Sequence, residues 1–139
     1  MIGERSAERV KIEVGSALTE LDDGPDDYEI RGRDLMTGIP KTIKISYSEV
    51  AFALDKSISK LEEAVLKALE ISPPELSADI YERGIYLTGG GALLRGLDKR
   101  IALKTKLPIH VADDALRAVV RGTGQALKNL PHFKPVLMT

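Results

Sequence analysis

The chain has 139 residues, of which 43% are hydrophobic and 29% are charged. This length is typical of one compact domain or two small lobes, and the hydrophobic content argues against an intrinsically disordered chain. The 20 basic and 21 acidic residues almost cancel, which argues against a nucleic-acid partner and against a polybasic membrane patch. Because the chain has no cysteine, disulfides, thiol nucleophiles and zinc–thiolate sites are excluded.

The sequence contains no segment that predicts membrane insertion or secretion. No charge-free run approaches the roughly 20 residues that a membrane-spanning helix needs. Charged residues stand at the amino terminus, where a signal peptide would be apolar: Glu4, Arg5, Glu8 and Arg9. We therefore expect a cytoplasmic protein.

A short helix and a hairpin are predicted at the beginning of the chain. Ser6 has the chemistry of an N-cap and Gly15 that of a helix stop. One side of the helix between them is apolar, with Ala7, Val10 and Val14. After an acidic, turn-forming loop, residues 28–33 and 42–46 alternate between apolar and polar side chains. This alternation predicts two antiparallel strands.

A long amphipathic helix follows, with Ser48 as its predicted N-cap and an end before Pro73. Its apolar residues recur at helical spacing and predict a buried stripe: Val50, Leu54, Ile58, Leu61, Val65 and Leu69. Phe52 and Leu66 project from the opposite side. Either a neighbouring element covers these two side chains or they contact another protein.

The second half alternates helices and strands. We predict a helix from Pro74 to Glu82, strands at residues 85–87 and 109–111, and helices at residues 97–105 and 115–130. This order predicts parallel strand pairing in an α/β layer. The last helix has an apolar stripe that we expect to be buried: Leu116, Val119, Val120, Thr123, Leu127 and Leu130. Gly122 and Gly124 flank that stripe, which indicates close approach by a packed strand or by a ligand.

The most informative segment is a strand that ends in Gly89, Gly90 and Gly91, with a helical turn directly after it. Glycine backbone can adopt positive φ and lie against a ligand, and the N–H groups of such a turn favour phosphate or a polar nucleotide edge. The pattern matches neither a dinucleotide fingerprint nor a P-loop. Tight packing explains such a turn about as well as ligand binding does.

Glu8 and Lys11 form the second candidate site. They are three residues apart on the first helix and therefore lie on one face. A carboxylate beside an ammonium could hold ribose hydroxyls or frame an adenine, but an ordinary solvated ion pair is the simpler interpretation. His110 and His132 have no metal-site spacing, and no nucleophile–base pair can be argued from two histidines. We therefore predict no metal site and no catalytic residue.

Several segments, in this order, resemble the carboxy-terminal part of the MreB/Mbl family of bacterial actin-like, rod shape-determining proteins. They are residues 2–16, 30–35, 73–76, 79–80, 82–84 and 87–98, followed by Pro108, Ala118-Val119 and Gly122-Thr123-Gly124. Each segment alone is a weak signal, but their joint occurrence is highly specific. The resemblance covers nearly the whole chain.

The resemblance implies an α/β fold: an actin-like ATPase with two domains, each built on an RNase H-like sheet, and ATP in the cleft between them. This chain is then a portion of domain II. Residues 1–73 correspond to its small α+β lobe and residues 74–139 to the carboxy-terminal part of its larger α/β lobe. The residues implied to contact the adenosine are Ala7, Glu8, Arg9, Val10, Lys11, Gly89, Gly90, Gly91 and Ala92.

The resemblance also implies ATP as ligand, with Mg²⁺ held mainly by other parts of the family's site. The implied partners are further copies of the protein in filaments and the cell-wall elongation machinery at the inner membrane. The family's phosphate-binding hairpins, water-activating carboxylate and membrane-contacting segment lie upstream of the matched region. We therefore expect a fragment or truncated product that carries the adenosine half of the site and hydrolyses no ATP alone.

Two alternatives stay open at this stage. The chain could be a fragment of another ATPase of the actin, Hsp70 and sugar-kinase superfamily, since these share an adenosine-contacting glycine turn. It could also be a free-standing module that keeps a filament surface and caps polymers.

Overall fold

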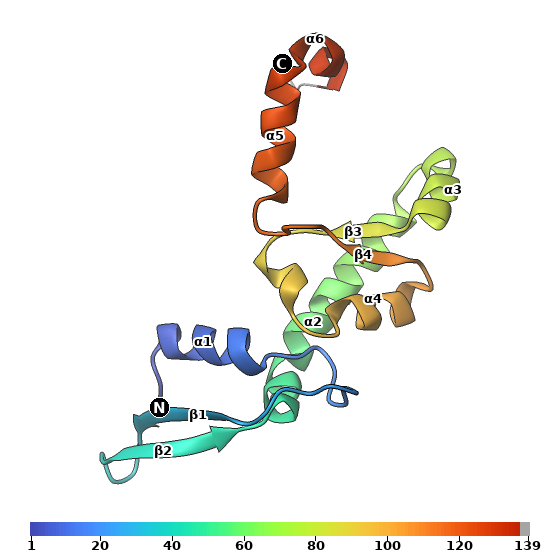
Figure 1. Ribbon diagram of the computed structural model, residues 1–139. Helices are drawn as coiled ribbons and strands as arrows, with labels where there is room; N and C mark the ends of the chain where they lie inside the picture. The colour runs from blue at the N-terminus through green and yellow to red at the C-terminus, as the bar shows by residue number, and fades with distance from the viewer. Residues whose placement is uncertain (137–139) are drawn as a thin grey trace.

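The computed structural model describes residues 1–136 (Figure 1). The elements are α1 (Glu4–Val14), β1 (Tyr28–Arg33), β2 (Pro40–Ile45), α2 (Tyr47–Glu70), α3 (Pro74–Arg83), β3 (Ile85–Leu87), the 3₁₀ helix η1 (Gly90–Leu93), α4 (Leu97–Thr105), β4 (Ile109–Val111), α5 (Ala118–Lys128), α6 (Leu130–Phe133) and the 3₁₀ helix η2 (Lys134–Val136). Within these residues, no helix combines the length and the apolar character needed to cross a membrane.

Strands β1 and β2 pair antiparallel, with Tyr28 opposite Ile45 and Ile30 opposite Ile43. The hairpin was predicted, although β2 begins at Pro40, two residues earlier than expected. In the connecting loop, the Asp34 carboxylate accepts hydrogen bonds from the N–H groups of Met36 at 2.8 Å and Thr37 at 3.1 Å. These bonds to the charged form lower the pKa of Asp34, with the Thr37 N–H as the larger cause.

The starts of both amino-terminal helices differ from the prediction. Helix α1 begins at Glu4 with Gly3 at the N-cap position, so Ser6 lies inside the helix. Helix α2 is capped by Ser46 and not by Ser48: the Ser46 hydroxyl accepts the Glu49 N–H at 3.3 Å, and the Glu49 carboxylate accepts the Ser46 N–H at 2.8 Å. This reciprocal capping box satisfies two backbone donors at once, which an N-cap at Ser48 could not do with Glu49.

The apolar stripe of α2 lies largely where the periodicity predicts it. Ile58 is buried, and Val50, Leu54, Val65 and Leu69 are partly buried. Leu61 contradicts the prediction, because it is 53% exposed. The adjacent Glu62 is buried in its place, since it pairs with Arg100 of α4. Of the two side chains predicted on the opposite side, Phe52 projects outward and is 81% exposed, whereas Leu66 is partly buried.

Arg100 is the main polar link between α2 and α4. Its Nε donates to Glu62 at 2.7 Å, its Nη2 lies 2.9 Å from the Asp55 carboxylate, and its Nη1 donates to the Ala17 carbonyl at 3.1 Å. The Arg100 and Glu62 side chains are only 18% and 10% exposed. The hydrogen bond that Arg100 donates to Glu62 is the largest cause that raises the pKa of Arg100, so the guanidinium stays charged.

Two apolar clusters form the core. The first joins α1 to the hairpin and the start of α2, through Val10, Val14 and Ile30. The second joins α2 to α4 and the β3–β4 sheet, through Ala17, Ile58, Leu97 and Ile101. The lobe boundary that we predict near residue 73 falls in the turn between α2 and α3, and the second cluster draws residues from both sides of it.

The second half confirms the predicted helix–strand alternation and the parallel pairing of β3 with β4. The last helix is the exception. Helix α5 begins at Ala118 and not at residue 115, because Asp114 has a φ of 53° and the Ala115 carbonyl accepts the Gly89 N–H at 2.8 Å.

The predicted burial of the α5 stripe is wrong. None of its residues is buried, and the helix projects away from the rest of the molecule (Figure 1). The large apolar side chains of this face are between 46% and 73% exposed: Leu116, Val119, Val120, Leu127 and Leu130. A Cβ placed on Gly122 or Gly124 would meet nothing within 4 Å, so neither glycine makes a close contact here.

Candidate functional site

Helix α1 has a core side and an open side. Val10 is buried against the hairpin, and Ala7, Glu8, Arg9 and Lys11 are exposed. The Lys11 ammonium donates to the Glu8 carboxylate at 2.7 Å, and the side chains are 45% and 57% exposed, respectively. Such an exposed pair contributes only about 0.2–0.5 kcal/mol to stability. The pair is therefore available to a ligand at little cost to the fold.

A groove of about 650 Å³ lies between α1, β2 and α2. Ala7, Glu8, Val10 and Lys11 belong to its lining, together with Ile2, Glu4, Ile43, Ile45, Glu49, Val50, Ala53 and Leu54. Arg9 is not part of that lining. The lining is largely apolar and includes the charged residues Glu4, Glu8, Lys11 and Glu49, a composition suited to a flat apolar group that carries polar edges.

The glycine turn follows β3 directly, as predicted. Gly89 has a φ of 80°, which disfavours residues with a side chain, and residues Gly90–Leu93 form the 3₁₀ turn η1. A Cβ on Gly91 would meet nothing within 4 Å, and one on Gly90 would meet only Leu116 at 3.5 Å. Internal crowding thus does not explain Gly90 or Gly91. Their open surface fits a group that approaches the backbone from outside, whereas Ala92 is buried below it.

The structure brings the end of α1 next to the end of the glycine turn. The Ala17 N–H donates to the Arg95 carbonyl at 2.8 Å, and Ser16 and Arg95 form a parallel bridge. Leu94 touches Gly15, where an added Cβ would lie 2.9 Å from its Cδ1. Gly15 is one helical turn from Lys11, and Leu94 donates to the Gly91 carbonyl at 3.1 Å. The residue after α1 is therefore in contact with the residue after η1, although the glycines do not line the groove that Glu8 and Lys11 line.

Two residues that hold this arrangement were not found from the sequence. The Arg95 guanidinium reaches the carbonyls of Ile12 and Gly15 at 3.5 Å and caps the carboxy-terminal end of α1. Arg100 fixes α4 to α2. The position of Arg95 shortly after the glycine turn is the only sequence signal that could have indicated its capping role. No local signal pairs Arg100 with Glu62, which lies 38 positions away in the chain.

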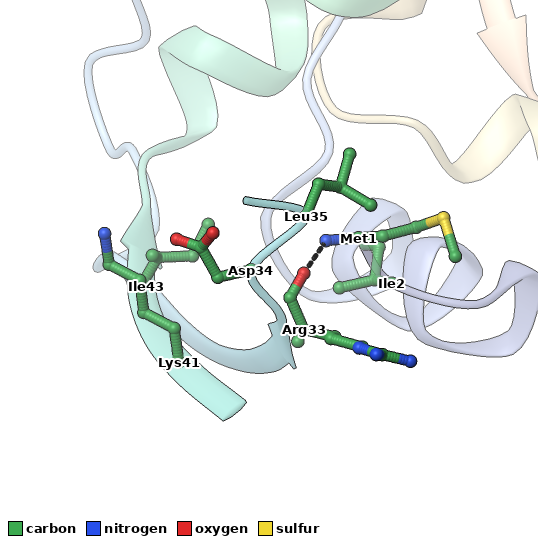
Figure 2. Close-up of a pocket in the computed structure, with 8 residues that line it drawn as sticks. Met1, Ile2, Arg33, Asp34, Leu35, Lys41 and Ile43 are labelled. Atoms are coloured by element: carbon green, nitrogen blue, oxygen red, sulfur yellow. Dashed lines mark hydrogen bonds between the residues drawn. The ribbon is translucent and has the colours of Figure 1, made fainter. Parts of the chain in front are cut away.

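A second, smaller cavity of about 290 Å³ lies at the amino terminus (Figure 2). Met1 and Ile2 lie there beside the hairpin, and the Met1 amino group donates to the Arg33 carbonyl. Asp34 and Lys41 also line it. It contains no residue of the predicted adenosine site. Across the described part of the chain, no group of three or more acidic or histidine side chains could hold a metal ion.

Solved structures define the class of this fold. MreB5 of Spiroplasma citri bound to ADP matches with a TM-score of 0.86 and 39% identity, over 93% of this chain and 39% of that chain. MreB5 of the same organism bound to AMPPNP matches with a TM-score of 0.86 and 37% identity, over 98% of this chain and 40% of that chain. The protein thus has the α/β fold of a portion of an actin-like ATPase.

The family model for MreB/Mbl protein matches residues 1–135, and this chain belongs to that family. Cell shape-determining protein Mbl of Bacillus subtilis is 45% identical over 94% of this chain and 38% of its own length. Cell shape-determining protein MreB of Escherichia coli is 46% identical over 92% of this chain and 36% of its own length. The chain thus spans less than two fifths of these relatives. Membership excludes the predicted alternative of another superfamily ATPase.

Proposed function

We propose that this chain forms the adenosine-contacting side of an ATP site in a filament-forming, cell shape-determining protein of the MreB type. The observation that carries the proposal is the fold match to two nucleotide-bound MreB5 structures, which extends over 93% and 98% of the chain. It is supported by the open glycine turn and by the exposed Glu8–Lys11 pair, which belong to two elements joined by the contact of Gly15 with Leu94.

The roles follow from side-chain chemistry. The Glu8 carboxylate accepts hydrogen bonds from ribose hydroxyls, and the Lys11 ammonium both orients that carboxylate and donates to an oxygen of the nucleoside. Gly90 and Gly91 let the nucleoside lie against backbone, because no side chain stands above them. Arg9 and Ala7 flank the pair on the open side of α1. ATP and its Mg²⁺ complete their phosphate contacts on residues outside this chain, which therefore hydrolyses no ATP by itself.

A titration of the ¹⁵N-labelled chain followed by NMR tests the site directly. Adenosine and ADP should shift the amide signals of residues 7–11 and 89–92 together, with one common dissociation constant. Inorganic phosphate should leave both segments unchanged, because the phosphate contacts lie elsewhere. Shifts confined to one segment, or two unrelated dissociation constants, would refute a shared adenosine site.

A pair of glycine variants adds a control. Gly91→Ala places a methyl group over the open turn with no atom of the protein within 4 Å of it, and it should weaken adenosine binding severalfold. The methyl group of Gly122→Ala on α5 also has nothing within 4 Å and should leave binding unchanged. Equal affinities for the two variants would contradict the role of the glycine turn.

In the cell, we propose that the chain acts as part of a filament in the cytoplasm, at the inner membrane, together with the cell-wall elongation machinery. Replacing the matched region of Bacillus subtilis Mbl by this chain tests that role. The chimaera should restore filaments and rod shape in cells that lack Mbl. A chimaera that accumulates and binds ATP but forms no filaments would count against the proposal.

A further inference from the structure

The backbone that follows α1 runs beside the backbone that follows η1. Ser16 and Arg95 form a parallel bridge, and the Ala17 N–H donates to the Arg95 carbonyl at 2.8 Å. Ser16 is 0% exposed and Ala17 is 1% exposed, so this contact is shielded from water. We call residues 15–18 together with residues 94–96 the junction.

The junction joins parts of the molecule that pack in different apolar clusters. Helix α1 is held on the hairpin by one cluster, whereas Ala17 belongs to the other, which includes residues of α2 and α4. Helix α2 crosses between the hairpin and the parallel sheet (Figure 1). The position of Glu8 and Lys11 relative to the glycine turn therefore depends on the contacts that connect the two clusters, among them those of Ala17.

One guanidinium contacts both α2 and the junction. Arg100 lies in the first turn of α4, shortly after η1. Its Nε donates to Glu62 at 2.7 Å and its Nη2 lies 2.9 Å from the Asp55 carboxylate, whereas its Nη1 donates to the Ala17 carbonyl at 3.1 Å. The planar fork of an arginine holds such acceptors in fixed directions. Ala17 is thus bonded through its N–H to Arg95 and through its carbonyl to Arg100.

We propose that Arg100 is a positioning residue for the adenosine site: its bond to the Ala17 carbonyl fixes the end of α1, and with it Glu8 and Lys11, relative to the glycine turn. Arg100 acts through the junction and not through contact with the nucleoside. The effect on binding rests on the proposed function, whereas the effect on the position of α1 concerns the geometry of the chain alone.

The contacts of Arg100 with α2 and its contact with Ala17 have separable consequences. The ion pair with Glu62 joins α2 to α4, and apolar residues of similar volume often replace a buried ion pair without loss of stability. An apolar side chain cannot donate to the Ala17 carbonyl. A buried carbonyl that loses its donor is costly, so the backbone relaxes toward water and carries the end of α1 with it. A residue needed only for packing between α2 and α4 would show no such effect.

A double variant separates the two roles. Arg100→Met alone leaves Glu62 buried without its partner, and adding Glu62→Leu removes that charge and restores an apolar contact. The double variant should melt close to the unchanged protein and bind adenosine severalfold more weakly. The dissociation constant is measured from the amide signals of residues 7–11 and 89–92. Folded and unfolded chains give separate amide signals, so the constant refers to the folded chain.

Asp55→Asn is the matched control. It weakens a contact of Arg100 with α2 at a side chain that is 60% exposed, and it keeps the bond to the Ala17 carbonyl. Its dissociation constant for adenosine should equal that of the unchanged protein.

A spin label measures the position of α1 without nucleotide. The chain has no cysteine, so Glu13→Cys, which is exposed near the end of α1, carries a single nitroxide. The label should broaden the amide signals of residues 90–94 and of β1. In the double variant the broadening of residues 90–94 should decrease, whereas that of β1 should stay, because α1 remains packed on the hairpin.

Equal adenosine affinities for the double variant and the unchanged protein, or equal broadening of residues 90–94, would overturn the proposal. If the double variant does not fold, Arg100→Lys takes its place: it keeps a positive charge beside the carboxylates but lacks the fork, so the same two losses are expected, and their absence overturns the proposal. An unchanged chain that binds no adenosine would refute the proposed function and the effect on binding. The spin label would then still decide whether Arg100 fixes α1.

Discussion

Helices α2 and α5 both have amphipathic sequences, but the apolar side of α2 is largely buried and that of α5 is exposed to solvent. Both carry apolar residues at helical spacing with charged residues on the other side. Helix α2 crosses the molecule between the hairpin and the parallel sheet, whereas α5 projects from its end (Figure 1). Ile58 of α2 is buried and Leu127 of α5 is 63% exposed. Amphipathic periodicity therefore specifies a face that can be buried, and only a neighbouring element buries it.

The contacts of Arg100 with α2 should give the largest effect on the free energy of unfolding, and α5 has no comparable contact within the described residues. Arg100→Met removes the partner of Glu62, whose side chain is 10% exposed, and leaves the Ala17 carbonyl without its donor. Breaking a mostly buried ion pair from one side costs about 3–5 kcal/mol. Urea unfolding should show this loss. Lys99→Met, next to it on α4 in a pair with exposed side chains, should change the unfolding free energy little.

Truncating one apolar side chain on each helix compares how much the apolar sides of α2 and α5 contribute to stability. Ile58→Ala leaves a cavity in the core and should lower the free energy of unfolding by about 2–4 kcal/mol. Leu127→Ala should change it by less than about 0.5 kcal/mol, because the side chain is already in solvent. Thermal unfolding of both variants measures the contrast. Equal losses would show that α5 packs against the rest of the chain in solution.

Removing the N-cap of α2 should have a smaller effect on the free energy of unfolding. Ser46→Ala removes the acceptor of the Glu49 N–H and should lower stability by about 1 kcal/mol. Ser48→Ala, two residues further along, keeps both capping-box hydrogen bonds and removes only a hydroxyl that lies 3.0 Å from that of Ser46, so it should lower stability by less than about 0.5 kcal/mol. A larger loss from Ser48→Ala would place the N-cap where the sequence alone put it.

The same capping box predicts a pH dependence. The Ser46 N–H, and then its hydroxyl, lower the pKa of Glu49 below its ordinary value of 4.5. Because the folded-state pKa is the lower one, this stabilisation is present above pH 4.5 and is lost as the pH falls through the lowered pKa. The difference in melting temperature between the unchanged protein and Glu49→Gln should therefore shrink on acidification. Glu63→Gln, exposed on the same helix, makes the same change in charge and controls for net charge.

The sequence determined most of the local structure and the family. Residues 85–87, 97–105 and 109–111 form the predicted elements, because glycine turns, helix stops and alternation act over a few residues. Helix starts were less well determined: Ser46 and Ser48 both precede Glu49, and only the reciprocal hydrogen bonds select Ser46. The family could be predicted because several short segments match it in the same order, and this information is present in the sequence without any knowledge of tertiary contacts.

Only the tertiary structure decided which surfaces are covered. It selected Glu62 over Leu61 for burial, because Arg100 lies opposite and needs a carboxylate. It left the α5 stripe in solvent and brought Gly91 close to the end of α1 through Leu94 and Gly15. The reason is the range of the interactions: periodicity records how a helix divides into two sides, but a contact between distant segments depends on where the chain returns in space.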